Sequence, residues 1–266
     1  MKIHYPMKVL AVKLEYRRLK MEKMTRGYYK TIKGIRNVVI TFDPDNPKYN
    51  NQHPRTLYVS GKLGMIYSRK INEYLSYKSE YDSLLSDWNS KYRFAPPRIR
   101  FPLVQFSDPH QMNNEYFKNQ TERRGNYVSD SPIVSRHGDL KSKNELLGMD
   151  LLEQLGIPFK YETNIFLKEI DETINPDCLI NFYEIDRCAY LEILGMNDKI
   201  EYFYKTSKKI YGFSKAKYRP GREVIYIFLY DKHNFDEEYF ISEILSAYDN
   251  LIPDDALIWT DEAKAV

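Results

Sequence analysis

The chain has 266 residues, of which 42% are hydrophobic and 15% aromatic, so it can bury the core of one large domain or two modest ones. No uninterrupted apolar run approaches the roughly 18 residues that a membrane span needs, and the start lacks the apolar stretch of a signal peptide, so we expect no membrane partner. Two cysteines are too few for a disulfide framework, which favours a reducing cytoplasm.

The net charge of +3 conceals two halves of opposite sign. Residues 1–135 hold 24 Lys and Arg against 12 Asp and Glu, a balance of +12, whereas residues 136–266 hold 16 against 25, a balance of −9. A basic half suits a polyanion such as nucleic acid, and an acidic half suits metal-dependent chemistry. Halves of opposite sign could also simply attract each other, and charge alone leaves both interpretations open.

The first half predicts an α+β region. Residues 10–33 are basic with weak helical periodicity, which indicates either an exposed helix or an arm that orders on binding. The pattern then predicts a strand at 36–42 and a helix at 71–92. Two further short strands are expected between them, at 56–60 and 65–68. Beyond Pro96-Pro97, the polar stretch to Pro132 is expected to be a linker with one short helix near 113–120.

The second half is more regular. A helix is predicted at 142–155, ended by Gly156, and a second helix at 198–211, ended by Gly212. The strand-like runs are 159–167, 178–183, 188–194 and 223–229, and a helix at 235–248 follows them. The predicted order is therefore α-β-β-β-α-β, then α.

Three carboxylates in this half stand out. Glu145 follows Ser142 near a helix start, Asp177 follows Pro176 before a strand, and Glu192 lies inside the apolar run 189–194. A carboxylate among apolar residues is costly to bury unless its charge is compensated, and a divalent cation shared with a second carboxylate would do so.

Each carboxylate also has a simpler explanation. Ser142 and Glu145 fit a capping box, in which the two side chains satisfy each other's backbone donors. Asp177 could be an acid at the edge of a strand, and Glu192 could pair with a buried Lys or Arg.

Asp177 and Glu192 fall in consecutive strand-like runs joined by a turn at 184–187. Asp177 lies about eight residues before this turn and Glu192 about six residues after it. Antiparallel pairing therefore brings both towards the same end of the hairpin. A bulge or twist of one or two residues would bring them level. Two carboxylates so placed repel each other unless a cation lies between them.

In this order the motifs resemble the PD-(D/E)XK nuclease superfamily, and more closely a branch found in bacterial genomes, phages and mobile elements. The likeness covers residues 136–229 and rests on five motifs in order. Four are the segments Lys141-Ser142-Lys143-Asn144-Glu145, Gly156-Ile157-Pro158-Phe159-Lys160-Tyr161-Glu162, Pro176-Asp177-Cys178 and Glu192-Ile193-Leu194-Gly195-Met196, and the fifth is the following helix, which matches at Asp198, Glu201, Tyr202, Lys205 and Lys209. The chain departs from the superfamily pattern two residues after Glu192, where Leu194 replaces the motif lysine, as it is also replaced in that branch.

The resemblance implies a restriction-endonuclease-like core in which Asp177, Glu192 and Glu145 are the catalytic acids and bind Mg²⁺, with Mn²⁺ as a substitute. It also implies a catalytic lysine supplied from elsewhere, and our order of candidates is Lys209, Lys205 and then Lys143. The position of Glu162 implies a supporting role, and the residues expected to contact nucleic acid are Arg136, Lys141 and Lys143.

The sequence therefore predicts an α/β nuclease domain at 130–266, with a small mixed sheet flanked by helices. A basic α+β region at 1–129 precedes it and is expected to bind nucleic acid. The expected function is Mg²⁺-dependent hydrolysis of phosphodiester bonds as a DNA endonuclease, with RNA as the other substrate considered and a homodimer left open. The alternative is a catalytically inactive, nuclease-like protein that binds nucleic acid or serves in assembly, and the missing motif lysine favours it.

Overall fold

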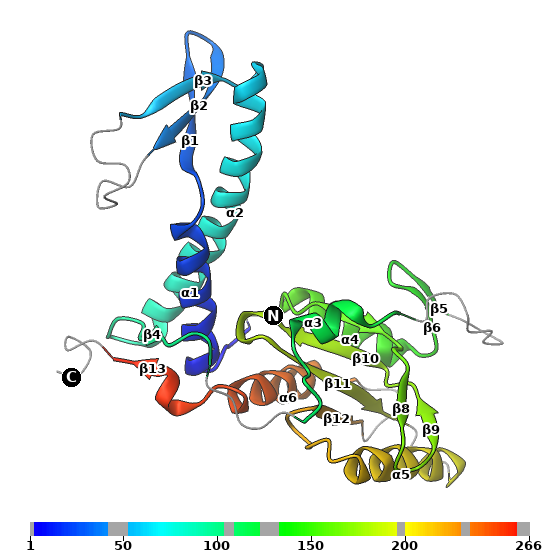
Figure 1. Cartoon of the computed structure of the whole chain (residues 1–266). Coiled ribbons are helices and arrows are strands. Elements are labelled where there is room, and N and C mark those ends of the chain that lie inside the picture. The colour runs from blue at the N-terminus through cyan, green and yellow to red at the C-terminus, as the bar shows by residue number, and fades with distance from the viewer. Residues whose placement is uncertain are drawn as a thin grey trace. The chain divides into compact units, whose positions relative to one another are not determined.

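The computed structural model describes residues 3–41, 53–103, 109–122, 133–195, 200–229 and 235–259. The protein is a mixed α/β protein (Figure 1), as predicted, and divides into two units. Unit 1 comprises Met1–Val9 and Arg100–Ala256, and unit 2 comprises Leu10–Ile99 and Leu257–Val266. The division lies at 99/100 rather than at the expected 129/130, because residues of the expected linker pack on unit 1: Cys188 N donates to Met112 O at 2.9 Å.

Unit 2 is built on an antiparallel sheet of β1 (Arg26–Ile32), β2 (Ile35–Thr41) and β3 (Arg55–Tyr58), which packs on α2 (Lys62–Lys91) through Val38, Ile40 and Ile71. The strand predicted at 65–68 is wrong, because these residues belong to the start of α2. Gly64 permits this start, since a Cβ there would lie 1.8 Å from Tyr58 O. A two-stranded sheet of β4 (Arg98–Ile99) and β13 (Leu257–Ile258) completes the unit.

The basic N-terminal segment forms α1 (Met7–Glu22), which is neither an exposed helix nor an arm. Residues from Val9 to Glu15 are all buried, including Lys13 and Glu15. A helix that is buried around its circumference shows no one-sided apolar stripe, which explains its weak periodicity. The same segment continues into β1, which the sequence pattern did not reveal.

The centre of unit 1 is a small mixed sheet, as predicted, in the order β12-β11-β10-β7. Its strands are β7 (Phe159–Tyr161), β10 (Cys178–Phe182), β11 (Arg187–Leu194) and β12 (Val224–Phe228). β10 pairs antiparallel with β7 and β11, while β11 and β12 are parallel and are joined through α5 (Ile200–Lys215). A parallel pair needs such a crossover.

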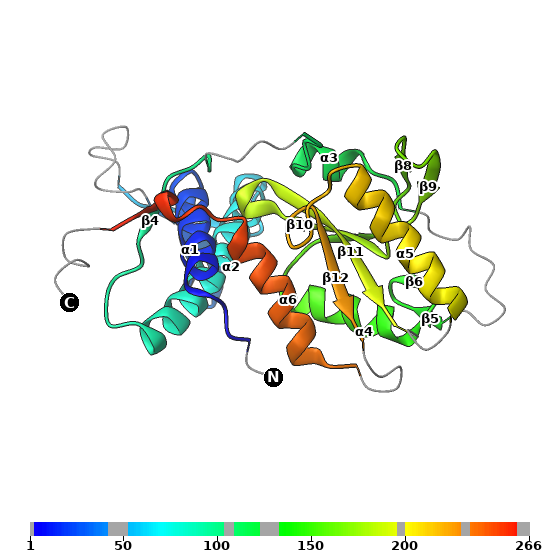
Figure 2. The same ribbon diagram turned by 90° about the horizontal axis from the view of Figure 1, so that it is seen from below.

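Helices cover both faces of this sheet. On one face, α4 (Lys143–Gln154) and α6 (Glu237–Asn250) meet at Gly148, where a Cβ would lie 2.8 Å from Ile193 and 3.1 Å from Phe240. On the other face, Tyr190 contacts Phe213 of α5 and hydrogen-bonds Tyr116 of α3 (Asn114–Asn119). Figure 2 shows α5 and α6 on opposite sides of β11 and β12.

Three predictions in unit 1 need correction. The single run at 159–167 is two strands, because Glu162 adopts a left-handed conformation (φ 44°) between β7 and β8 (Ile165–Leu167). β8 pairs with β9 (Glu172–Ile174), where we expected a turn, and β5 (Ile133–Ser135) pairs with β6 (Gly138–Leu140) just after the expected linker, where we predicted no strand. α5 runs through Gly212 instead of ending there, because Ile170 and Leu167 fill the space that a side chain would take.

None of the described helices is long and apolar enough to cross a membrane.

The loop between α5 and β12 is held by an ion pair that makes stability depend on pH. The carboxylate of Glu223 accepts from the backbone N of Arg219 at 2.8 Å and pairs with its guanidinium. Burial acts to raise the pKa of Glu223, but the hydrogen bonds and charge of Arg219 outweigh it and lower the pKa below the ordinary 4.5. A carboxylate with a lowered pKa stabilises the fold above its ordinary pKa and loses this effect as the pH falls through its folded value.

We therefore expect Glu223→Gln to reduce the free energy of unfolding by about 1 kcal/mol at pH 7. The difference from wild type should shrink below pH 4.5, the ordinary value. Urea unfolding at several pH values measures it, and a difference that stays constant with pH would contradict this account.

Candidate active site

Asp177 and Glu192 lie side by side at the end of the β10–β11 hairpin. The pairing of Cys178 with Leu191 places Asp177 opposite Glu192 one step further on, without the bulge or twist that counting from the turn had suggested. Ile193 N donates to Asp177 Oδ2 at 2.7 Å, which fixes the carboxylate against β11. On its other side, Glu162 N donates to Asp177 O at 3.0 Å. Asp177 is therefore held between two strands of the sheet.

Glu192 is 1% exposed and shares the sheet face of Tyr190, which α5 covers. Lys209 of α5 donates to both of its carboxylate oxygens, at 2.9 and 2.8 Å, and to Asn175 O at 3.1 Å. The sequence offered two interpretations of Glu192, a metal ligand or the partner of a buried cation. In this structure Glu192 has the cation partner, and the partner is the first-ranked lysine.

Glu145 reaches the same region from the start of α4. Ser142 Oγ caps this helix by accepting from Glu145 N at 3.2 Å, as the capping pattern predicts. The Glu145 carboxylate, however, accepts from Lys141 N at 3.1 Å and from the Tyr161 hydroxyl at 2.8 Å. Glu145 is thus a buried carboxylate with its own donors as well as part of a cap.

Burial raises the pKa values of all three acids, and the charge of Asp177 raises those of the other two further. Burial, followed by the charge of Asp177, raises the pKa of Glu145 to about 7 and that of Glu192 to about 8. Burial of its carboxylate also raises the pKa of Asp177, although the residue is partly exposed, and Lys209 opposes this rise. Burial acts to lower the pKa of Lys209, but Glu192 and Asp177 outweigh it, so its pKa is raised. The site therefore favours additional positive charge.

The three carboxylates fit a hard divalent cation by their chemistry, since Mg²⁺ prefers carboxylate oxygens as ligands. In their present positions, no three His, Cys, Asp or Glu side chains of the described residues are grouped closely enough to hold an ion. An ion at Glu192 would compete with Lys209, which now bonds both oxygens. The chemistry of the side chains fits a metal, but their arrangement is that of an acid–lysine cluster.

The other residues predicted for the site are dispersed. Lys205 and Lys143 are exposed. Arg136 is exposed but forms ion pairs with Asp150 and Glu153, both at 2.8 Å, which reduces its availability to a phosphate. Lys141 forms an ion pair with the buried Glu162, so each of these two residues offsets the charge of the other.

Sequence reasoning missed the role of two tyrosines. Tyr161 donates to Glu145, and its position directly before Glu162 in the motif was the available signal. Tyr202, at the start of α5, has its pKa raised by burial and then by the charge of Asp177. Its position could be found only by knowing how α5 packs.

Replacing Tyr161 with Phe tests the support of Glu145. We expect a loss of about 2 kcal/mol in the free energy of unfolding, because a hydrogen bond to a buried carboxylate is removed. Chemical denaturation measures this loss, with Tyr204→Phe at an exposed position of α5 as the matched control. Equal stabilities of the two variants would show that the hydroxyl contributes nothing.

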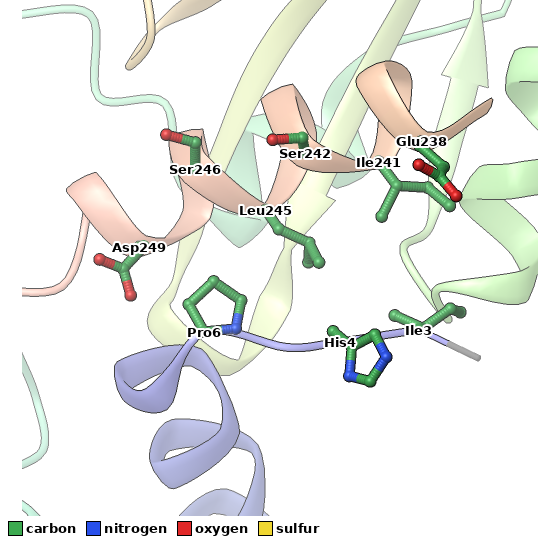
Figure 3. A pocket seen from close by; sticks show the side chains of 9 residues that line it. All are labelled: Ile3, His4, Pro6, Glu238, Ile241, Ser242, Leu245, Ser246 and Asp249. Atoms are coloured by element: carbon green, nitrogen blue, oxygen red, sulfur yellow. The ribbon is translucent and has the colours of Figure 1, made fainter. Parts of the chain in front are cut away.

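Two cavities in unit 1 lie outside this cluster. One, of about 450 Å³, is bordered by Tyr161 and also lined by Phe117, Phe159, Arg136 and His137. The other, of about 470 Å³, lies between the N-terminal segment and α6 (Figure 3), where Ile241 and Leu245 face Pro6 and His4. The first adjoins the acids through Tyr161, whereas the second contains none of the predicted site residues.

Searches with the chain found no matching protein-family model, no matching curated protein and no matching solved structure. What the site does must therefore be argued from its own residues.

Proposed function

We propose that the protein is a Mg²⁺-dependent nuclease that hydrolyses phosphodiester bonds, with DNA as its substrate and internal cleavage as its mode of action. The observation that carries this proposal is the position of Asp177 beside the buried Glu192, with Lys209 in contact with Glu192. Buried acids with raised pKa values beside a lysine are costly for stability, and such clusters are concentrated at functional sites.

The order of elements in unit 1 supports the same proposal. α4, α5 and the four strands of the central sheet occur in the α-β-β-β-α-β order expected of a restriction-endonuclease-like core, with the separate β8–β9 hairpin inserted between β7 and β10. Leu194, at the position of the motif lysine, is buried in the core, and Lys209 from α5 supplies a cation at the acids instead.

In this proposal Asp177, Glu192 and Glu145 bind Mg²⁺. The ion would acidify a water molecule and offset the charge that grows on the phosphoryl oxygens. Lys209, once released from Glu192, would donate to the attacking water or to a phosphoryl oxygen. Lys143, in the first turn of α4, would contact the substrate backbone. Lys141 would have to leave Glu162, and Arg136 its two acids, to do so.

One specific observation favours a second candidate function. Because Lys209 already neutralises Glu192 without an ion, the cluster could serve structure alone in a nuclease-like protein that binds nucleic acid without cutting it. Such a protein would need no metal at Glu192.

A cleavage assay separates the two functions. The full chain is incubated with plasmid, single-stranded and branched DNA, and with RNA, in Mg²⁺, Mn²⁺ or EDTA. Metal-dependent cutting of DNA supports the nuclease. Binding without cutting in either metal supports the inactive protein, and cutting of RNA alone would contradict the proposed substrate.

A further inference from the structure

Unit 2 carries a strongly basic surface that the proposed chemistry does not use. We call residues 26–41 and 53–70, which form the β1–β2–β3 sheet and the start of α2, the basic hairpin module. These residues contain eight Lys and Arg and no acid, and the next acid after residue 70 is Glu73. Over the whole sequence from 26 to 70 there are nine Lys and Arg against two Asp, at 43 and 45. Such a field attracts polyanions.

One face of the sheet packs on α2, and the other carries exposed side chains on its two outer strands. Gly27 lies against Ile71 of α2, where a Cβ would come within 2.4 Å of the side chain, and Val38 packs on the same residue. Successive side chains of a strand point to opposite faces, so Tyr28 and Lys30 point away from α2. Tyr28 is 48% exposed, and Lys30 is exposed as well.

On the face away from α2, the exposed side chains lie on the two outer strands, whereas the middle strand is buried between them. Lys30 of β1 pairs with Asn37 of β2, which is 2% exposed, and Asn37 pairs with Tyr58 of β3, which is 63% exposed. Tyr28 and Tyr58 lie on the two outer strands. They are separated by two strand spacings of about 5 Å each and by two residues along the strands, because Tyr28 is level with Val39 and Tyr58 with Asn37. This separation is too large for stacking on neighbouring bases of one strand, but it is close to the major-groove width of about 12 Å.

The tip of the β1–β2 hairpin adds a second indication. Lys33 and Gly34 both have positive φ, 48° and 78°, and form a tight two-residue turn. The turn is flanked by the cross-strand pair Ile32 and Ile35, which are 41% and 50% exposed. A cation between two exposed aliphatic side chains suits the major groove, where the cation can contact phosphate and the apolar groups can contact base methyl groups.

We propose that the basic hairpin module binds double-stranded DNA, with Lys30 and Lys33 on the phosphate backbone and the exposed Tyr28 and Tyr58 towards the major groove. The module would add a DNA-binding surface outside the acid cluster. This inference rests on the proposed nuclease function only in taking DNA as the polymer that is bound. Arg36, which stacks on Tyr29 at 4.3 Å, and the exposed Arg55, Lys62 and Arg69 extend the positive surface beyond the face itself.

The test measures binding of a fluorescein-labelled DNA duplex to the full chain by anisotropy, in EDTA so that no cleavage occurs. The test variant is Lys30→Gln/Lys33→Asn. The control is Lys168→Gln/Lys217→Asn, which removes two exposed lysines of unit 1, one of them also at positive φ. Circular dichroism checks that both variants fold as the wild type does.

We expect wild-type affinity to fall steeply between about 50 and 200 mM salt. The module variant should bind about tenfold more weakly, with a salt slope reduced by about two, whereas the control keeps wild-type affinity. Tyr58→Ala should weaken binding with the slope unchanged, because a groove contact releases no counterion.

Four results would overturn the proposal: no duplex binding by wild type at low salt, equal affinities of the module variant and the control, no effect of Tyr58→Ala, or tighter binding of single-stranded DNA or duplex RNA. Because cleavage is not measured, these results do not depend on whether the acid cluster is catalytic. Conversely, a chain that cuts DNA while the module variant binds like wild type would contradict only the module.

Discussion

Replacing Asp177 with Asn is expected to abolish metal-dependent cleavage while leaving the fold as stable as wild type or more so. The carboxylate is proposed to bind the ion, and its loss should reduce the rate by about a thousandfold or more, as loss of an essential charge at a catalytic centre does. Its charge also raises the pKa of Glu145 and Glu192, so removing it relieves repulsion among buried acids. The Asn side-chain oxygen can still accept from Ile193 N.

Thermal unfolding with and without Mg²⁺ gives a measurement independent of cleavage. An ion that binds only the folded state raises the melting temperature, so Mg²⁺ should stabilise wild type but not Asp177→Asn. Asp171→Asn is the matched control, because Asp171 lies in an exposed turn at φ 52°, which Asn tolerates. Loss of both activity and stability in Asp177→Asn, with no Mg²⁺ effect on wild type, would instead indicate a structural carboxylate.

Lys209→Met is expected to affect both activity and stability. Without Lys209 the 1% exposed carboxylate of Glu192 loses the cation that bonds both of its oxygens. Breaking such a pair leaves a buried acid uncompensated, at a cost of about 3 kcal/mol. Protonation of Glu192 limits this cost, because burial has already raised its pKa to about 8. Cleavage should fall by about a hundredfold or more if Lys209 acts on the reacting phosphate.

A matched control lies next to it on the same helix. Lys208 is largely exposed and pairs with Glu172 at the surface, so Lys208→Met should change neither activity nor stability appreciably. Lys209→Arg should restore stability and part of the activity, since it keeps a cation within reach of Glu192. If Lys205→Met lowers cleavage as much as Lys209→Met does, the assignment of the lysine is wrong.

The local features of the site could be predicted from the sequence. The Ser142 cap, the strands around Asp177 and Glu192, and their approach at one end of the hairpin follow from patterns within a few residues. The choice among the three lysines required the packing of α5 on the sheet, because Lys205 and Lys209 share a helix and only burial distinguishes them.

The incorrect predictions have a common physical cause. Gly212 suggested a helix end and residues 65–68 suggested a strand, but in both places tertiary packing overrides local preference. Gly212 is required for the close approach of Ile170 and Leu167 rather than for a turn. The buried α1 gave a weak signal because its neighbours cover it on more than one side.

The path of the chain between the two units has a practical consequence for making fragments. Because unit 1 takes its first nine residues from the start of the chain and unit 2 takes its last strand from the end, neither unit is a continuous piece of sequence. A fragment ending at residue 99 would retain β4 but lose β13, leaving the backbone groups of Arg98 and Ile99 without their partner strand. Expression of residues 1–99 alone should therefore yield a less stable product than the full chain.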